Sequence, residues 1–338
     1  MLLTNCHMMR FTVVILILLL LSSICCFSQA LIVGRISSNV DGHPIPYVNI
    51  GIERSPIGTL SNMDGSFQLS IPEKYLQDTI LFSALGYERQ VTAIQSLIKN
   101  TTIKIVLREK ITTLNQITVQ AKKLKGKSFI LGNRFTKGGF LYADSLSAGA
   151  AMALLIDNKY PAYHEDLHYP FHVEKLNIFI DKNSIGTFKM RVRFLDRDSL
   201  SGQPTVDLFP KDIMITSSIK KGWLDIDLTR YGLVITKPFF LAIEWIMEDR
   251  DRLSLLNEYA VYKRENPDKV YSDSTIVDGK KVGYWNYMDF TPGTHLGVSP
   301  LPFSLQHYTC YYRTNSFGEW KRSPVILTAR LSVSSLGK

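Results

Sequence analysis

The sequence predicts an all-β protein with two domains. Its 338 residues leave room for about two domains of roughly 150 residues each. Apolar residues make up 45% of the chain and charged residues 20%, a balance that excludes a disordered or collagen-like protein. Aromatic residues reach 11%, and short β-branched runs are separated by glycine- and proline-containing turns, which favours strands over helices.

Residues 1–30 have the pattern of a signal peptide. Arg10 precedes the apolar run FTVVILILLLL at residues 11–21, and small residues allow cleavage after Ala30, while cleavage before Gln29 fits equally well. The apolar run is too short to span a hydrocarbon core of roughly 30 Å. We therefore expect an exported chain that acts in the periplasm, in the outer membrane or at the cell surface.

Three of the four cysteines, Cys6, Cys25 and Cys26, lie in this leader. Lipidation at Cys25 or Cys26 would tether the chain to a membrane, but residues 22–24 lack the leucine and the small residue expected before such a cysteine. The mature chain would keep only Cys310, which excludes an intrachain disulfide. We expect Cys310 to be a buried, unreactive thiol.

The formal charge is +9, and part of it is concentrated in the linker at residues 122–127, which contains four lysines. For an exported chain we expect no nucleic-acid partner, whereas anionic envelope polymers or lipid headgroups would suit the charge and allow peripheral membrane association. A solvated hinge is the alternative explanation of the linker, and it would let the two domains move independently.

From Leu31 onward the chain alternates between short strands and turns. Apolar and polar residues alternate at 47–52, 67–71 and 102–107, and residues 80–87 are almost continuously apolar. Asp-Gly dipeptides between these runs are turn signals. This near-regular spacing predicts a small antiparallel sandwich.

The same region carries a family resemblance, because its glycines and prolines stand in a recognisable register. The residues concerned are Gly42-x-Pro44-Ile45-Pro46, Asn62-x-Asp64-Gly65-x-Phe67 and Phe82-Ser83-x-x-Gly86-Tyr87. Residues 31–109 closely resemble the carboxypeptidase-regulatory-like domain, a seven-stranded transthyretin-like sandwich. The resemblance implies a non-enzymatic module of the cell envelope. Residues 114–119 resemble the short strand that ends such domains where they precede the plug of TonB-dependent receptors, and an accessory subunit of an outer-membrane receptor is a further alternative by analogy with those receptors.

Residues 110–127 are interpreted as a short strand and the basic linker, and residues 128–338 as a larger, jelly-roll-like β-sandwich. Seven segments have strand-like patterns: 171–181, 187–195, 212–217, 222–228, 239–247, 308–314 and 325–333. The strict alternation in Lys189–Phe194 predicts a sheet with one face in water. This half resembles an uncharacterised sandwich that follows the same N-terminal domain in other exported bacterial proteins.

His164-Glu165-Asp166-Leu167-His168 matches H-E-x-x-H, in which a helix brings two zinc-binding histidines together. Prolines at 161 and 170 bracket the motif and strand-like segments flank it, so we interpret it as a loop without metal. A zinc peptidase using His164, Glu165 and His168 is the alternative, as is a weak surface metal site that adds His172.

Two acidic motifs are also interpreted as structural. Asn62, Asp64 and Gly65 match part of a calcium loop, but Ile71 stands where the bidentate glutamate belongs, which favours a plain turn. Asp225 and Asp227 alternate with apolar residues as on the polar face of a strand. Their use as glycosidase carboxylates remains open, because such chemistry needs a defined separation of two acids.

The longest irregular stretch, 248–307, is where we expect a ligand. It contains a short helix at 253–263, a hairpin at 277–280 and the aromatic residues Tyr284, Trp285 and Tyr287. Exposed aromatic rings beside amides and carboxylates suit a sugar or a peptide, although the same rings could pack the loop onto the sandwich.

The function that these patterns predict is an exported, non-enzymatic binding or structural module without a cofactor. Its expected partner is a glycan or an envelope protein. No complete catalytic set is visible, since G-x-S-x-G, P-loop and G-x-G-x-x-G motifs are all missing from the sequence. A secreted hydrolase, either a zinc peptidase or a glycosidase, is the competing class.

Overall fold

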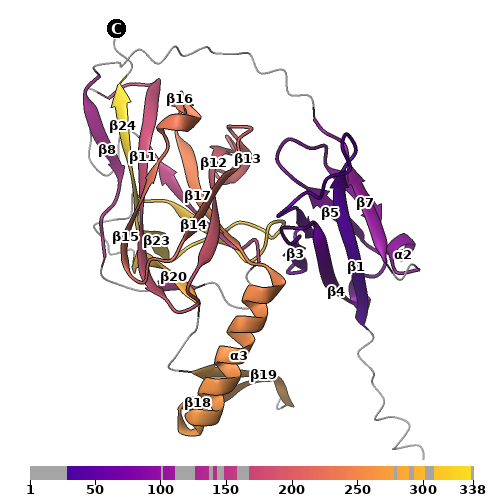
Figure 1. The fold of residues 1–338 in the computed structure, drawn as a ribbon. Helices are drawn as coiled ribbons and strands as arrows, with labels where there is room; N and C mark the ends of the chain where they lie inside the picture. The colour runs from indigo at the N-terminus through magenta and orange to yellow at the C-terminus, as the bar shows by residue number, and fades with distance from the viewer. Residues whose placement is uncertain are drawn as a thin grey trace, which may run out of the picture.

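The structure is a computed structural model that describes residues 29–99, 102–110, 126–136, 140–142, 148–157, 167–277, 280–288, 293–300 and 308–335. It contains two β-sandwiches, and the N-terminal one lies beside the larger C-terminal one (Figure 1). The all-β prediction is confirmed.

The N-terminal sandwich has seven strands within the described residues. They are β1 (Gln29–Ser38), β2 (Asn49–Gly51), β3 (Gly58–Leu60), β4 (Ser66–Pro72), β5 (Thr79–Ser83), β6 (Gln90–Ala93) and β7 (Ile103–Leu107), with the short helices η1 (Glu73–Tyr75) and α2 (Ile94–Leu97). One sheet has the order β4-β1-β7 and the other β3-β2-β5-β6. Residues that alternate along the strands, such as Ile36, Phe67, Phe82 and Ile105, form its core.

The prediction that this sandwich is wholly antiparallel is wrong. β1 and β7 run parallel, with Gly34 opposite Ile103 and Ser38 opposite Leu107. A parallel pair needs a long crossover, and the five strands between β1 and β7 provide one. The pattern of apolar residues determines which face of each strand is buried but not the direction of the neighbouring strand. The parallel pairing of β1 with β7 therefore could not be predicted from the sequence.

The C-terminal sandwich consists of two facing sheets. The seven-stranded sheet has the order β13 (Pro204–Asp207), β12 (Phe188–Arg197), β17 (Phe239–Ile246), β10 (Ala151–Ile156), β21 (Cys310–Arg313) and β22 (Lys321–Arg322), with β14 (Ile213–Ser217) also on β12. The eight-stranded sheet has the order β23 (Val325–Leu327), β20 (Thr294–Pro300), β11 (Phe171–Asn183), β24 (Ala329–Ser335) and β8 (Ser128–Gly132). β15 (Gly222–Asp227) and β16 (Val234–Ile235) also pair with β11, and β9 (Phe140–Tyr142) pairs with β20.

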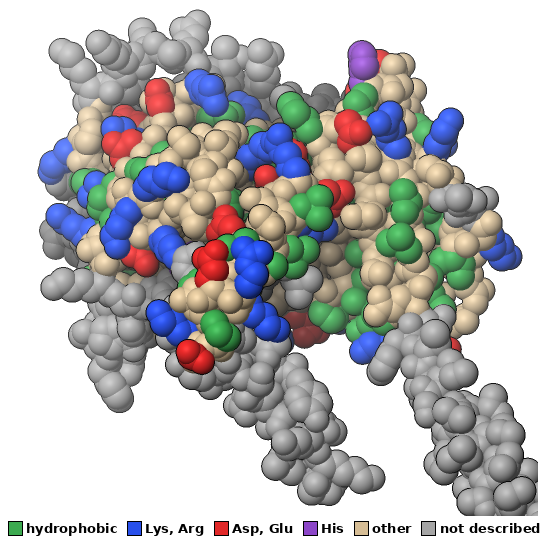
Figure 2. All heavy atoms as spheres, turned by 60° about the horizontal axis from the view of Figure 1, so that its bottom comes forward, with side chains coloured by type: hydrophobic (Ala, Val, Ile, Leu, Met, Phe, Trp, Pro, Cys, Tyr) green, Lys and Arg blue, Asp and Glu red, His purple; other side chains and the backbone are tan. Residues whose placement is uncertain are grey.

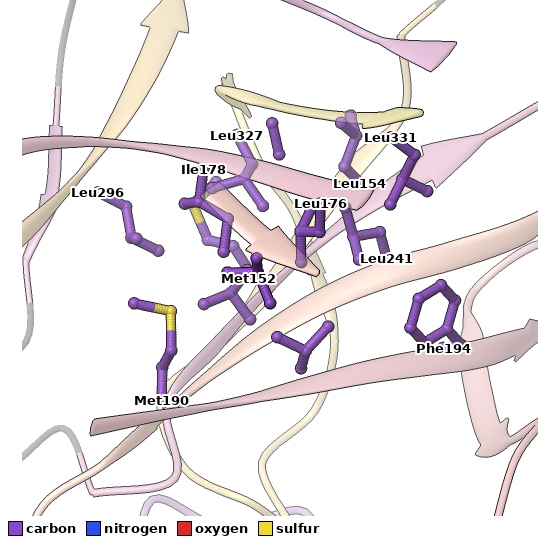
Figure 3. Close-up of a cluster of buried hydrophobic side chains, with 14 of the residues drawn as sticks. Met152, Leu154, Leu176, Ile178, Met190, Phe194, Leu241, Leu296, Leu327 and Leu331 are labelled. Atoms are coloured by element: carbon purple, nitrogen blue, oxygen red, sulfur yellow. The ribbon is translucent and has the colours of Figure 1, made fainter. Parts of the chain in front are cut away.

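The core of this sandwich lies between the two sheets. Figure 3 shows Met152, Met190 and Leu241 from one sheet opposite Ile178 and Leu331 from the other. Strands β8, β10, β11 and β12 alternate between the two sheets along the chain, as expected for a jelly-roll-like sandwich.

The expectation that residues 248–307 are mostly irregular is wrong. The stretch contains helix α3 (Asp249–Glu265), the antiparallel hairpin of β18 (Val270–Val277) and β19 (Lys280–Met288), and strand β20. The helix begins four residues before the predicted segment, because the Asp251 carboxylate accepts a hydrogen bond from the Glu248 backbone N at 3.1 Å and caps the first turn. The predicted hairpin is confirmed by the pairing of Val277 with Lys280.

Candidate functional site at the domain interface

The N-terminal sandwich contacts the outer face of the seven-stranded sheet, and Tyr47 is at the centre of this contact. Tyr47 is buried in contact with apolar residues of the C-terminal sandwich, the Lys189 ammonium lies 5.8 Å from the centre of its ring, and its hydroxyl donates to Glu248 Oε1 at 2.8 Å. Its backbone oxygen accepts from Arg191 Nη2 at 3.0 Å. Tyr47 adopts a φ of 55°, which a non-glycine residue rarely does, so cross-domain contacts support a strained backbone here.

A second contact joins the β3–β4 turn to the first turn of α3. Asn62 Nδ2 donates to Asp249 Oδ2 at 2.9 Å, and the Asp249 backbone N donates to Asn62 Oδ1 at 3.1 Å. Arg252 Nη2 donates to Thr59 Oγ1 at 3.1 Å. The Asn62 to Gly65 segment is the turn that the sequence predicted, since the Gly65 N donates to the Asn62 carbonyl. The side chain of Asn62 thus serves the domain interface.

A third contact is made by the loop between β21 and β22, which reaches toward the N-terminal sandwich in Figure 1. Three hydrogen bonds cross the interface here: Asn315 Nδ2 to the Ser55 carbonyl at 2.9 Å, Ser316 Oγ to Asn49 Oδ1 at 2.8 Å, and Arg54 N to the Phe317 carbonyl at 2.9 Å. The Arg89 guanidinium also lies 5.5 Å from the centre of the Phe317 ring. The two sandwiches are therefore joined at three separate places.

A completely buried carboxylate, Glu244, lies beneath this interface on β17. Glu244 Oε1 accepts from Arg191 Nη1 at 3.1 Å, while Oε2 accepts from Arg193 Nη1 at 3.0 Å and from Arg313 Nη2 at 2.9 Å. Arg191 Nε also donates to Asp212 at 2.7 Å. A buried charge is tolerated only with such partners.

Small residues in neighbouring strands make room for these arginines. Ala151 stands opposite both Glu244 and Arg313 in the sheet register, and Ala242 stands opposite Arg193. Because a methyl group leaves space above the sheet, Arg313 can reach across β10 to Glu244. The strand sequence thus creates a shallow trough in which the charged groups meet.

The electrostatics of the cluster favour the charged form of Glu244. Burial alone would raise the pKa of Glu244, but Arg193, Arg191 and Arg313 together lower it below its ordinary value. Burial lowers the pKa of Arg313 to about 10, partly offset by Glu244. For Arg193, burial opposes the charge, yet Asp207 and Glu244 raise its pKa overall. The cluster is a set of charges neutralised within the protein.

The prediction of a water-facing side on Lys189–Phe194 is wrong. Arg191 is only 8% exposed, because Glu244, Asp212 and the N-terminal sandwich surround it. Sequence reasoning therefore missed Glu244, Arg191, Arg193 and Arg313 as interface residues. The signal that could have found them is a single acid in the apolar strand Phe239–Ile246, combined with two arginines at period 2.

A cleft of about 1070 Å³ opens between the two sandwiches. Its walls combine the 83–89 loop that carries the family pattern, the edge strand β13, and the arginines Arg193 and Arg313. Arg89 pairs with Glu53 at 3.1 Å, and Arg193 pairs with Asp207 at 2.6 Å. Basic and acidic side chains are intermixed on the face seen in Figure 2. The cleft lining itself combines the acids Glu53, Glu88 and Asp207 with four basic residues and several apolar ones, so it is a hollow of ligand size without a single dominant sign of charge.

The predicted ligand residues Tyr284, Trp285 and Tyr287 lie on strand β19 of the hairpin, where Trp285 pairs with Asp273. Their side chains are outside the described part of the chain. The structure therefore neither brings them together nor separates them, and the ligand site remains a prediction.

The H-E-x-x-H motif is also largely outside the described residues, which resume at Leu167. His168 is exposed and precedes β11, whereas His172 lies on β11. Within the described ranges no group of three His, Cys, Asp or Glu side chains could hold a metal ion. The interpretation of residues 164–168 as a loop without metal stays a prediction.

The remaining predicted residues have structural positions. Asp225 and Asp227 are exposed on β15, alternating with the buried Ile226, as the strand pattern predicted. Cys310 is buried, as predicted, and burial raises the pKa of its thiol to about 12, which favours the protonated form.

A comparison with known protein families identifies the N-terminal sandwich. A family model described as CarboxypepD_reg-like domain matches residues 32–119. The N-terminal sandwich is therefore a CarboxypepD_reg-like domain, as the resemblance implied. The match extends beyond β7 and includes residues 114–119, which were expected to form the strand that ends such domains.

Other comparisons add little. A search of curated proteins found no match. Among solved structures, the chain is similar to the major pilin subunit BcpA of Bacillus cereus, with 8% identity, 89% of this chain and 69% of the pilin covered, and a TM-score of 0.17. That score is too low to support an argument about fold or function. Among the described residues, no helix is long and apolar enough to cross a bilayer.

Proposed function

We propose that the chain is an exported binding or structural module of the bacterial envelope, in which the two sandwiches act as one unit. The observation that carries this proposal is the three-part interface around Tyr47, Asn62 and Phe317, which fixes a CarboxypepD_reg-like domain against a second sandwich. A cleft formed by both domains gives such a unit a surface that neither domain has alone.

The partner we propose is a glycan or an envelope protein. The cleft volume of about 1070 Å³ is at the upper end of ligand-site sizes, and Val206 on its wall is 69% exposed. A bound partner would contact Arg193 and Arg313, which share Glu244 with the interface residue Arg191. A ligand bound in the cleft would therefore contact the same cluster of Glu244 and its arginines that lies at the domain interface.

Export would follow from the leader, and we propose cleavage before Gln29. Strand β1 begins at Gln29, which pairs with Pro72, and Gln29 Oε1 accepts a hydrogen bond from Ser70 Oγ at 3.2 Å. Cleavage after Ala30 would remove two residues of this strand. N-terminal sequencing of the exported chain distinguishes the two sites.

Fractionation of cells and retention of the purified chain on isolated envelope material test the proposal. We expect the mature chain in an envelope fraction, and we expect Val206→Lys to weaken retention at least about tenfold, which is about 1.4 kcal/mol. Leu200→Lys is the matched control, because Leu200 is 97% exposed and is not part of the cleft wall.

The hydrolase alternative is tested on the same preparation. We expect no stoichiometric metal by mass spectrometry in the parent chain, in His164→Ala or in His168→Ala. Retention of the chain in the cytoplasm with its leader uncleaved would contradict the proposal. So would stoichiometric zinc that both histidine variants lose.

A further inference from the structure

The outer face of the eight-stranded sheet, opposite to the interface, carries an ordered set of polar groups. We call it the open face and define it by Lys175, Asn177, Trp223, Asp225, Asp227, Arg330 and Ser332. The register places six of them in two rows across β24, β11 and β15, and Trp223 follows on β15, opposite Phe179. One row is Arg330, Asn177 and Asp225, and the other is Ser332, Lys175 and Asp227.

The first row is held in place by its own contacts. Arg330 Nε donates to Asn177 Oδ1 at 3.2 Å, and Asn177 Nδ2 donates to the Asp225 carboxylate. The Arg330 guanidinium lies 4.5 Å from the centre of the Trp223 ring, and Phe179 meets that ring edge to face. These contacts engage Nε, so the Nη groups are the Arg330 donors left for a ligand. Little side-chain freedom remains to be lost on binding.

The second row borders a hollow of about 570 Å³. Lys175, Asp227, Ser332 and the exposed Ile130 are among its lining residues. Asp227 Oδ1 accepts from Thr229 N at 2.9 Å and from Thr229 Oγ1 at 2.6 Å, so this carboxylate is also fixed in position. The hollow thus offers hydrogen-bonding groups beside an apolar side chain.

The charges of the open face favour a neutral ligand. Within the two rows Arg330 and Lys175 are matched by Asp225 and Asp227, so donors and acceptors alternate between strands about 4.8 Å apart, and Glu174 adds one further acid to the lining of the hollow. An anionic polymer would meet two carboxylates and a cationic one two basic groups. A polyhydroxylated chain can donate to the acids, accept from the basic groups, and lay the apolar faces of two different sugar rings against Ile130 and against the side of Trp223 that Arg330 does not cover.

We propose that the open face is a binding site for a neutral glycan chain, with Trp223, Asp225 and Arg330 as its central contacts. This inference goes beyond the proposed function, because it adds a second binding site with its own ligand class. It places glycan binding on β11, β15 and β24, away from the cleft and from the predicted aromatic residues of β19.

The test is titration calorimetry of the mature full chain with soluble hexasaccharides of glucose, mannose and N-acetylglucosamine. We expect at least one of them to bind, and Asp225→Asn and Arg330→Gln to weaken binding about tenfold or more, because each removes a group that contacts the sugar hydroxyls. Trp223→Leu should have a similar effect. Asp196→Asn and Lys237→Gln, which remove a partly exposed ion pair between β12 and the segment before β17, are the controls and should bind within about twofold of the parent.

Circular dichroism melting curves accompany each variant, so that loss of folding is separated from loss of binding. Binding that is unchanged in all three open-face variants would overturn the assignment of this site. Failure of the parent to bind any of the three sugars would overturn the ligand class. In both cases retention of the parent on envelope material, with its sensitivity to Val206→Lys, would show that the proposed function still holds.

Discussion

The two outer faces of the C-terminal sandwich differ in how they use charged residues. On the seven-stranded sheet, Glu244 is buried among three arginines and covered by the N-terminal domain. On the eight-stranded sheet, Lys175, Asp225 and Asp227 remain exposed. We call the first the closed face, defined by Glu244, Arg191, Arg193 and Arg313.

This comparison shows that burial, and not residue type, decides whether a row of charged residues stabilises the fold or is available to bind a ligand. Both faces carry basic and acidic side chains at strand period 2. On the closed face the cost of removing charges from water is offset by the ion pairs of Glu244 with its three arginines, so the cluster contributes to the stability of the fold. On the open face the same groups stay hydrated and can exchange water for a ligand. Substitutions should therefore separate the faces by their effect on folding.

The largest effect on folding is expected for Glu244→Gln. The change leaves three arginines in a buried site without their carboxylate, so the free energy of unfolding should fall by about 3–5 kcal/mol. Urea denaturation followed by circular dichroism measures it. Glu319→Gln, at an exposed position, is the control and should change stability by less than about 0.5 kcal/mol. Equal stability of the two variants would contradict the role of the closed face.

The closed face should also make the free energy of unfolding depend on pH. The pKa of Glu244 is lower in the folded chain than its ordinary value of 4.5. As the pH falls, the Glu244 carboxylate is therefore protonated in the unfolded chain before it is protonated in the folded chain. The contribution of Glu244 is therefore complete above pH 4.5 and is lost as the pH falls through its folded pKa. Denaturation midpoints measured from pH 7 downward should fall more steeply for the parent than for Glu244→Gln. Parallel curves would contradict this expectation.

A smaller loss is expected when one cross-domain hydrogen bond is removed. Tyr47→Phe keeps the buried ring but takes away one of the two donors to Glu248 Oε1, which still accepts from Lys189 Nζ at 2.7 Å, so the cost should be about 0.5–1.5 kcal/mol. Tyr75→Phe is the control on the N-terminal domain, away from the interface. Differential scanning calorimetry should show the Tyr47 variant melting earlier and with the two domains less coupled. An unchanged melting profile would argue against a fixed interface.

The smallest effect on stability is expected for the open face. Lys175→Gln and Asp227→Asn change exposed groups, so the free energy of unfolding should stay within about 0.5 kcal/mol of the parent. The same urea series measures these variants beside Glu244→Gln. A loss of several kcal/mol would show that the open face is structural and would remove the contrast between the two faces.

The sequence was most informative where local pattern decides structure. Alternation of apolar residues located most strands, and the register of Gly42, Pro44, Asp64 and Gly65 identified the N-terminal domain. The direction of β7 and the length of α3 were not predicted, because strand direction depends on distant pairing and the helix starts at a polar cap.

The interface was missed for a related reason. The strand pattern predicted that Arg191 and Arg193 face solvent. Nothing in their own strand indicates that a buried acid and, for Arg191, another domain lie next to them. The cluster combines β12, β17 and β21, which lie far apart in the chain. Long-range complementarity of this kind is not visible in local periodicity.

The central claim is that the two sandwiches form one unit, and amide hydrogen exchange tests it most directly. The backbone N of Arg54 donates to Phe317, and that of Asp249 donates to Asn62, so both amides report on cross-domain bonds. We predict slow exchange at both positions in the mature chain, and faster exchange at both in Tyr47→Ala while core strands β5 and β17 stay protected. Exchange in the parent at the rate of unstructured amides would contradict the account.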